Sequence, residues 1–216
     1  MDFGLTDDQQ LFHETTRKFL EDTSPLAVVR QVADDQPDGF DREWWRRGAE
    51  LGWISMLVAE ELGGGSVSGH GLGDLVLVAE EFGRMVAPGP LIPTNVVAAA
   101  LSRSGSAVHH KLLEGLVGGE TIATWCPLDA TSTNGVTATV AGNGFVLSGT
   151  SRPVESAGQA DLVLVTARTD GGLSQFVVPA ATPGLTTDPA VSLDLVRSGR
   201  FDELEELARR FVGAIV

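Results

Sequence analysis

The hydrophobic pattern of the sequence changes its period near Gly118-Gly119, and this change constrains the fold more than any other feature. Before these glycines, apolar residues recur at the three- and four-residue spacing of amphipathic helices, and after them they alternate as in strands. The pattern predicts an α+β fold, with an N-terminal all-α helical domain over residues 1–119 and a small antiparallel β-barrel or sandwich domain over residues 120–200. The helical period then returns and predicts a short C-terminal helix over residues 201–216.

The first helix has a clear start signal. Thr6 followed by Gln9 predicts a capping box, and Asp7 and Asp8 lie where the helix dipole favours negative charge. Apolar spacing predicts further helices over residues 42–51, 72–85, 95–102 and 107–117.

Six short strands are predicted in the second part of the chain. Gly142-Asn143-Gly144 indicates a hairpin turn between two of them, and Asp170-Gly171-Gly172 indicates a second turn. The predicted strands cover residues 121–125, 136–140, 145–148, 162–167, 173–178 and 185–187.

Charge and hydropathy exclude several classes of function. The 29 acidic residues outnumber the 15 basic ones and give a net charge of −14. Because no basic stripe could hold a phosphate backbone, we expect no nucleic-acid partner. The longest apolar run, residues 96–101, is far shorter than the ~20 residues of a membrane helix, so we expect no membrane span. The first residues are acidic where a secretory signal is basic, and the cytoplasm is the expected compartment.

No catalytic or metal site is evident from the residues alone. The four histidines lack the spacing that places two imidazoles on one helix face, so we expect no metal. Cys126 has no histidine near it in sequence, which favours a buried thiol over a nucleophile. The glycine-rich residues 63–73 lack the context of a nucleotide-binding loop, so a connection between helices is favoured over a loop that lines a ligand pocket. The pairs Glu60-Glu61 and Glu80-Glu81 are most simply solvated.

Several local strings resemble the acyl-CoA dehydrogenase family. Residues 1–22 are similar to its opening helix, and residues 191–202 look like the last strands of its β domain in actinobacterial steroid- or fatty-acid-type members. The most specific match is LGWISMLVAEELGGGSVSGHGLGDLVLVAEEFGR, residues 51–84. The resemblance implies a helical domain, a β domain, FAD as cofactor and an acyl-CoA thioester as substrate, whose α-proton a carboxylate removes while the flavin accepts the β-hydride.

The resemblance also places the flavin at two segments of this chain. The family's T-E-P-x-x-G-S-D corresponds here to WCPLDATST, residues 125–133, and its G-T-K-x-W/F-I-T corresponds to GTSRPVE, residues 149–155. Pro153 thus replaces the aromatic residue that lies beside the flavin. By position, the residues expected to bind the cofactor are Trp125, Cys126, Ser132, Val154, Glu155 and Ser156.

The catalytic base of most members belongs to a C-terminal four-helix domain, and the sequence ends near the point where that domain begins. We therefore expect no catalytic residue in this chain, and a homo- or hetero-oligomer with a dehydrogenase-type subunit that completes the site. The alternatives are a non-catalytic binding or scaffold subunit of a dehydrogenase complex, and a truncated, inactive family member.

Overall fold

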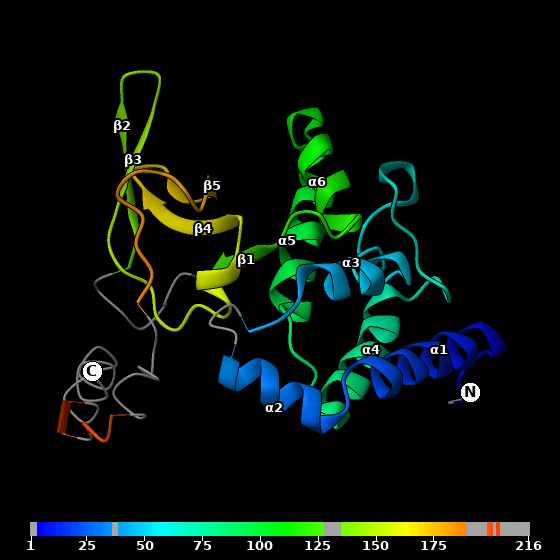
Figure 1. Cartoon of the computed structure of the whole chain (residues 1–216). Helices are drawn as coiled ribbons and strands as arrows, with labels where there is room; N and C mark the ends of the chain where they lie inside the picture. Colours follow the sequence, from blue (N-terminus) through cyan, green and yellow to red (C-terminus); the bar gives the residue numbers. More distant parts are fainter. Residues whose placement is uncertain (1–3, 36–38, 128–134, 189–197, 201, 204–216) are drawn as a thin grey trace. The chain divides into compact units, whose positions relative to one another are not determined.

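The computed structural model describes residues 4–35, 39–127, 135–188, 198–200 and 202–203 (Figure 1). The chain forms two compact units, residues 1–123 and residues 124–216, which we call the helical unit and the β unit. The sequence placed the boundary near Gly119, and the separate C-terminal helical segment stays a prediction. Of that segment the structure describes Asp202 and Glu203, which are helical.

The helical unit confirms the predicted series of helices and adds one. Thr6 Oγ1 accepts a hydrogen bond from Gln9 N, and Gln9 Oε1 accepts one from Thr6 N, at 3.2 and 3.1 Å, so the capping box is present. The helix missed by the sequence analysis is α2, in which Leu26 and Val28 are exposed and mark no buried face. The helices are α1 (Asp7–Thr23), α2 (Leu26–Asp35), α3 (Arg42–Glu50), α4 (Gly71–Met85), α5 (Leu91–Ser104) and α6 (His110–Val117), with short 3-10 turns η1 (Glu60–Leu62) and η2 (Ala107–His109).

Helix α5 (Leu91–Ser104) begins earlier than predicted, and Pro93 lies in its first turn. A proline there removes no intrahelical hydrogen bond, since the first N–H groups of a helix have no partner within it. Further along α5, Thr94 Oγ1 donates a hydrogen bond to Ala123 O at 3.0 Å, and Asn95 Nδ2 donates to Trp53 O at 2.9 Å. Both side chains are fully buried and tie α5 to the rest of the helical unit.

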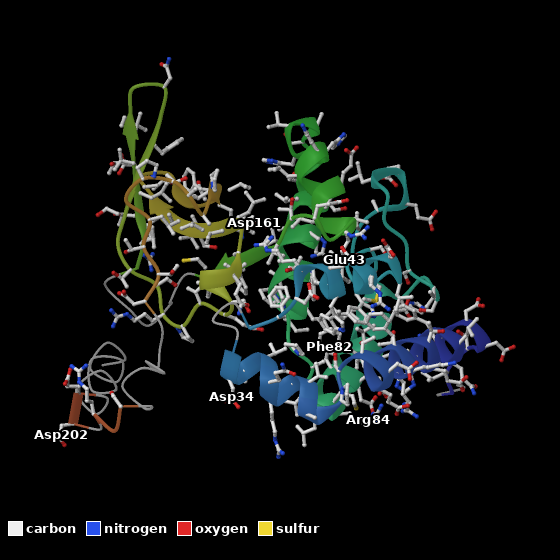
Figure 2. The ribbon with its side chains drawn as sticks, in the orientation of Figure 1. Asp34, Glu43, Phe82, Arg84, Asp161 and Asp202 are labelled. Atoms are coloured by element: carbon white, nitrogen blue, oxygen red, sulfur yellow. The ribbon has the colours of Figure 1, made fainter. Side chains whose placement is uncertain are left out.

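An aromatic cluster forms the centre of the helical unit. Trp53 is fully buried, and its ring centroid lies 4.8 Å from that of Phe82, 5.4 Å from Phe19 and 5.6 Å from Trp44. Phe82 belongs to α4 and is labelled in Figure 2. Gly48 of α3 is required beside this cluster, because a Cβ atom at this position would lie 2.0 Å from Trp53 Cζ3.

The β unit contains a five-stranded mixed sheet. Strand β2 pairs antiparallel with β3, β4 pairs antiparallel with β5, and β2 meets β4 in parallel at Thr137 and Arg168. The strand order is β1-β4-β2-β3, with β5 also paired to β4. The strands are β1 (Ala123–Cys126), β2 (Thr137–Ala141), β3 (Gly144–Ser148), β4 (Leu162–Thr169) and β5 (Gly172–Pro179), with a 3-10 turn η3 (Ala157–Gln159) before β4.

The predicted α+β class is confirmed, while two details of the β prediction change. The sheet is not antiparallel throughout, because the connection between β3 and β4 passes across β2 and makes β4 run parallel to β2. Within the described residues the five strands form an open sheet. The predicted strand at residues 185–187 is wrong: Leu185 follows a turn, its N–H bonds to Thr182 O, and its side chain packs on the β core from a loop.

Candidate functional site

The structure brings the end of strand β1 next to the segment of residues 151–156. Thr124 Oγ1 donates a hydrogen bond to Glu155 O at 2.5 Å. Ser151 Oγ donates to Pro127 O at 3.1 Å. Both contacts end on main-chain oxygens, so they hold the two segments together whatever the side chains at the accepting positions are.

Cys126 turns into the core of the β unit. Its side chain is 6% exposed and packs in an apolar cluster with residues that include Val136, Ala138 and Val163. Burial raises the pKa of the Cys126 thiol, and a hydrogen bond with Ser151 opposes part of that rise. The thiol therefore stays protonated near neutral pH, which agrees with the predicted inert, buried cysteine.

Trp125 lies on the opposite face of β1, because neighbouring strand residues point to opposite sides. Its side chain is 37% exposed, and its Nε1 donates a hydrogen bond to Thr166 Oγ1 of β4 at 3.3 Å. Of the two β1 residues assigned to the cofactor, only Trp125 presents its side chain at a surface.

The three remaining described positions follow one another in the segment before η3. Val154 packs against the apolar cluster of the β unit, whereas Glu155 is exposed. Ser156 has a left-handed backbone, with φ of 54°, and its carbonyl accepts a hydrogen bond from Gln159 N at 3.1 Å. Ser132, the sixth predicted position, lies outside the described residues.

These side chains do not fit a flavin as a set. A protein tunes a flavin through hydrogen bonds to the heteroatoms of its ring system, which requires donors beside the ring. Cys126 faces the core, the Trp125 N–H is already donated to Thr166, and Glu155 carries a carboxylate that accepts rather than donates. Of the described set, Ser156 alone adds a side-chain donor, so no chemical step is assigned to flavin bound by these residues.

A charge cluster around the buried carboxylate of Glu81 lies between α1 and α4, where the sequence predicted a solvated side chain. Glu81 is fully buried: its Oε1 accepts hydrogen bonds from Arg17 Nε and Nη2 at 3.0 and 2.7 Å, and its Oε2 accepts one from Arg84 Nε at 2.7 Å. His13 Nε2 lies 2.8 Å from the same Oε1. Burial pushes the pKa of Glu81 upward, but the two guanidinium groups outweigh it and hold that pKa at about 2. The solvated interpretation is wrong for Glu81 and correct for its exposed neighbour Glu80.

A second buried carboxylate fastens the glycine-rich connection. Asp74 is fully buried at the start of α4 and accepts hydrogen bonds from Ser66 Oγ at 2.6 Å, Ser68 Oγ at 2.7 Å and Gln9 Nε2 at 2.9 Å. Burial raises the pKa of Asp74, and these donors lower it further than burial raises it. Residues 63–70 connect two helical elements, whereas residues 71–73, which the prediction included in the connection, belong to the first turn of α4. The serines at alternate positions before Asp74 are the sequence signal that could have revealed this anchor.

Two general searches of the described residues gave negative results. No group of three or more His, Cys, Asp or Glu side chains in that part of the chain is placed to hold a metal ion. None of the helices described there has the length and hydropathy needed to cross a membrane.

Comparison with known proteins identifies the family. Residues 6–120, more than half of the chain, match the sequence model described as "Acyl-CoA dehydrogenase, N-terminal domain". The chain belongs to the acyl-CoA dehydrogenase family. It is 35% identical over 169 residues to acyl-CoA dehydrogenase FadE27 of Mycobacterium tuberculosis, an alignment that covers 76% of this chain and 43% of that relative.

Solved structures of related proteins share the fold of this chain. The ChsE4-ChsE5 complex from Mycobacterium tuberculosis gives a TM-score of 0.78 at 31% identity, over 88% of this chain and 52% of that chain. A variant of the Tcur3481-Tcur3483 steroid ACAD gives a TM-score of 0.74 at 33% identity, over 85% of this chain and 52% of that chain. The chain therefore spans about half the length of the relatives that it matches.

Proposed function

We propose that this chain is a subunit of an acyl-CoA dehydrogenase assembly that oxidises the α,β bond of an acyl-CoA thioester with FAD, and that a dehydrogenase-type partner subunit completes its site. The observation that carries the proposal is the disagreement between fold and site. The family fold is present, whereas the described side chains at the expected cofactor positions do not form a flavin-binding set.

The relatives support a partner of this kind. Two of the structural neighbours are described by pairs of different chains, ChsE4 with ChsE5 and Tcur3481 with Tcur3483. In such a pair, one chain can retain the family fold and contribute surface, while the other contributes the donors and the base. The description of one neighbour as a steroid ACAD favours a steroid side-chain thioester as substrate over a simple fatty acyl thioester. The proposed compartment is the cytoplasm.

A non-catalytic scaffold subunit is the second candidate, and the orientation of Cys126 favours it. A residue that would have to contact the cofactor instead forms part of the apolar core. Its substitution by a polar residue would disturb folding rather than catalysis. The third hypothesis is a truncated, inactive family member. Under this hypothesis no subunit pairing produces activity.

Co-expression with a dehydrogenase-type subunit tests the proposal. The measurement is oxidation of steroid and fatty acyl-CoA thioesters by each chain alone and by the co-purified pair, with an artificial electron acceptor. We expect turnover by the pair only. A stable pair in which the partner alone is equally active would favour the scaffold, and no turnover in any pairing would contradict the proposed catalytic subunit.

A matched pair of variants tests whether this chain contributes side chains to the site or is only present in the assembly. Ser156→Ala removes the hydroxyl donor of the described set, whereas Ser148→Ala changes an exposed serine of β3 that lies outside residues 151–156. We expect Ser156→Ala to lower turnover by the pair without loss of assembly, and Ser148→Ala to leave it unchanged. Equal turnover of both variants would contradict a contribution of this chain to the site.

A further inference from the structure

The β2–β3 hairpin is a two-stranded arm of the sheet in the β unit. Strand β2 meets β4 at Thr137 and Arg168, and from Ala138 to Ala141 its partner among the described strands is β3. The arm extends past strands β4 and β5 (Figure 1). Two strands alone are marginally stable in water, and a third strand is normally needed. The arm therefore has the character of a sheet that lacks one strand.

The main-chain groups of β3 alternate between its two sides. Because the hairpin turn has two residues, the N–H and C=O groups of Gly144, Val146 and Ser148 point toward β2. Those of Phe145 and Leu147 point outward, and within the described part of the chain they have no ladder partner. We call this side the outer edge of β3. A row of outward main-chain donors and acceptors fits one kind of partner, an extended strand.

The outer edge of β3 lacks the features that normally protect an edge strand. Such strands usually carry a charge, a proline or a bulge that blocks further pairing. Strand β3 has no charge or proline and pairs with β2 in unbroken register, and residues 130–151 are the longest stretch of the sequence without Asp, Glu, Lys or Arg. The outer edge of β5, by contrast, ends at Pro179, which has no N–H to offer on that side. The sheet thus protects one edge and leaves the other open.

The side chains beside the open edge are apolar on both faces of the arm. Val140 and Phe145 are register partners on one face and are 75% and 50% exposed, and Val146 on the other face is 54% exposed. A strand added here would pack beside Phe145 and Val146, so an uncharged strand rich in β-branched or aromatic residues fits best. Two copies of this chain, each with a net charge of −14, repel one another, which favours a different subunit as the source of that strand.

We propose that the outer edge of β3 pairs with an extended, uncharged strand of the partner subunit and so adds a strand to the sheet of the β unit. The partner strand exchanges main-chain hydrogen bonds with Phe145 and Leu147, and its side chains cover Phe145 and Val146. This inference rests on the proposed function only for the identity of the partner.

Hydrogen exchange resolved to single amides tests the pairing. It is measured on the full chain alone and on the chain co-purified with a dehydrogenase-type subunit. We expect the amides of Phe145 and Leu147 to exchange at least tenfold more slowly in the pair, because strand pairing protects them. The outward amides of β5, at Leu173, Gln175 and Val177, are the matched control and should keep their rates within twofold.

Exposed apolar residues on the two edge strands give matched variants. Val146→Lys adds a charge at the open edge, and Leu173→Lys adds the same charge on β5 at a side chain of similar exposure, 60%. We expect Val146→Lys to weaken the pair at least tenfold and Leu173→Lys to leave its affinity within twofold. Val146→Glu should also weaken the pair. Opposite effects of Lys and Glu at Val146 would contradict the inference, because net charge rather than strand pairing would then hold the subunits together.

Slow exchange of Phe145 and Leu147 in the chain alone would overturn the inference. Protection that does not depend on protein concentration would assign the edge to another segment of this chain, and protection that does would assign it to a second copy. Unchanged exchange in a stable pair would also overturn it, as would the lack of a stable pair with any dehydrogenase-type subunit. The exchange measurement needs no variant, so its result stands even where a variant fails to fold.

Exchange and turnover are independent readouts of the same pair. A protected outer edge of β3 in an inactive pair would contradict the proposed function alone. An active pair in which Phe145 and Leu147 exchange as in the isolated chain would contradict the strand pairing alone.

Discussion

The helical unit and the β unit hold their polar groups in different ways. In the helical unit, Glu81 and Asp74 are fully buried, and each accepts several hydrogen bonds from side chains, which include Arg17 and Gln9 of α1. At the expected cofactor segment of the β unit, the connection runs from the Thr124 side chain to the main chain of Glu155. The hydrogen bonds of Thr124 and Ser151 need their own hydroxyl groups, but they do not depend on the side chains at the accepting positions, Glu155 and Pro127. The side chain of Glu155 is therefore not needed for this connection.

Removal of the Glu81 carboxylate gives the largest effect that we expect. Glu81→Gln leaves Arg17 and Arg84 without their shared acceptor and places a neutral amide in a fully buried site. We expect a loss of roughly 3 kcal/mol in the free energy of unfolding, because the fall of the Glu81 pKa from 4.5 to about 2 corresponds to an interaction of this size with its charged form. Chemical denaturation measures it. The control is Glu80→Gln at the exposed neighbour, which should change stability by less than about 0.5 kcal/mol.

Acid titration sharpens the same contrast. The folded pKa of Glu81 is about 2, below its ordinary value of 4.5, so its stabilising contribution is present above pH 4.5 and is lost as the pH falls toward 2. The difference in unfolding free energy between the native chain and Glu81→Gln should stay constant from pH 7 to about pH 5 and shrink below that. A difference that does not change with pH down to about 3 would show that the carboxylate charge is not the cause.

Packing around the aromatic cluster gives the next effect in size. Gly48→Ala places a Cβ atom 2.0 Å from the Trp53 ring, and we expect a loss of about 2 kcal/mol, since overpacking outweighs the gain in helix propensity. Gly83→Ala is the matched control, because its Cβ meets open space, and it should stabilise the isolated chain by about 0.5 kcal/mol. Thermal unfolding of both variants checks this pair. Similar shifts of the same sign would contradict the described packing.

The smallest effect belongs to the β unit. Cys126→Ser places a hydroxyl in an apolar cluster, and we expect a loss of about 1 kcal/mol, reduced by the nearby Ser151. Cys126→Ala, which keeps the site apolar, should lose no more than that. If Cys126→Ser instead changed flavin binding or turnover of the assembled pair without a change in stability, the assignment of Cys126 to the core would be wrong.

Sequence reasoning predicted most of the elements but few of the contacts. Capping residues, helical spacing and hairpin glycines are local signals, so α1, α4 and the β2–β3 hairpin were predicted nearly in full. The burial of Glu81 depends on Arg17, which lies 64 residues away in sequence, and no local pattern reports that distance. The parallel contact of β2 with β4 was missed for the same reason.

The residues expected to bind the cofactor show a different limit of prediction from sequence. Position in a motif predicted that Trp125 and Cys126 would both face a flavin. Strand alternation allows only one of two neighbouring residues to point to a given face, and here Cys126 is the one that fills the core. The segments that a motif brings together can thus be predicted from sequence, but the direction of each side chain requires the pairing of the strands.

The absorbance spectrum between about 350 and 500 nm tests the central claim most directly, because a bound flavin absorbs in this region. It should be recorded for the purified chain alone and for the chain co-purified with a dehydrogenase-type subunit. We expect a colourless chain alone and a flavin spectrum for the pair. An absorbance that corresponds to about one flavin per chain in the isolated protein would contradict this expectation, since this chain would then hold the cofactor with its own residues.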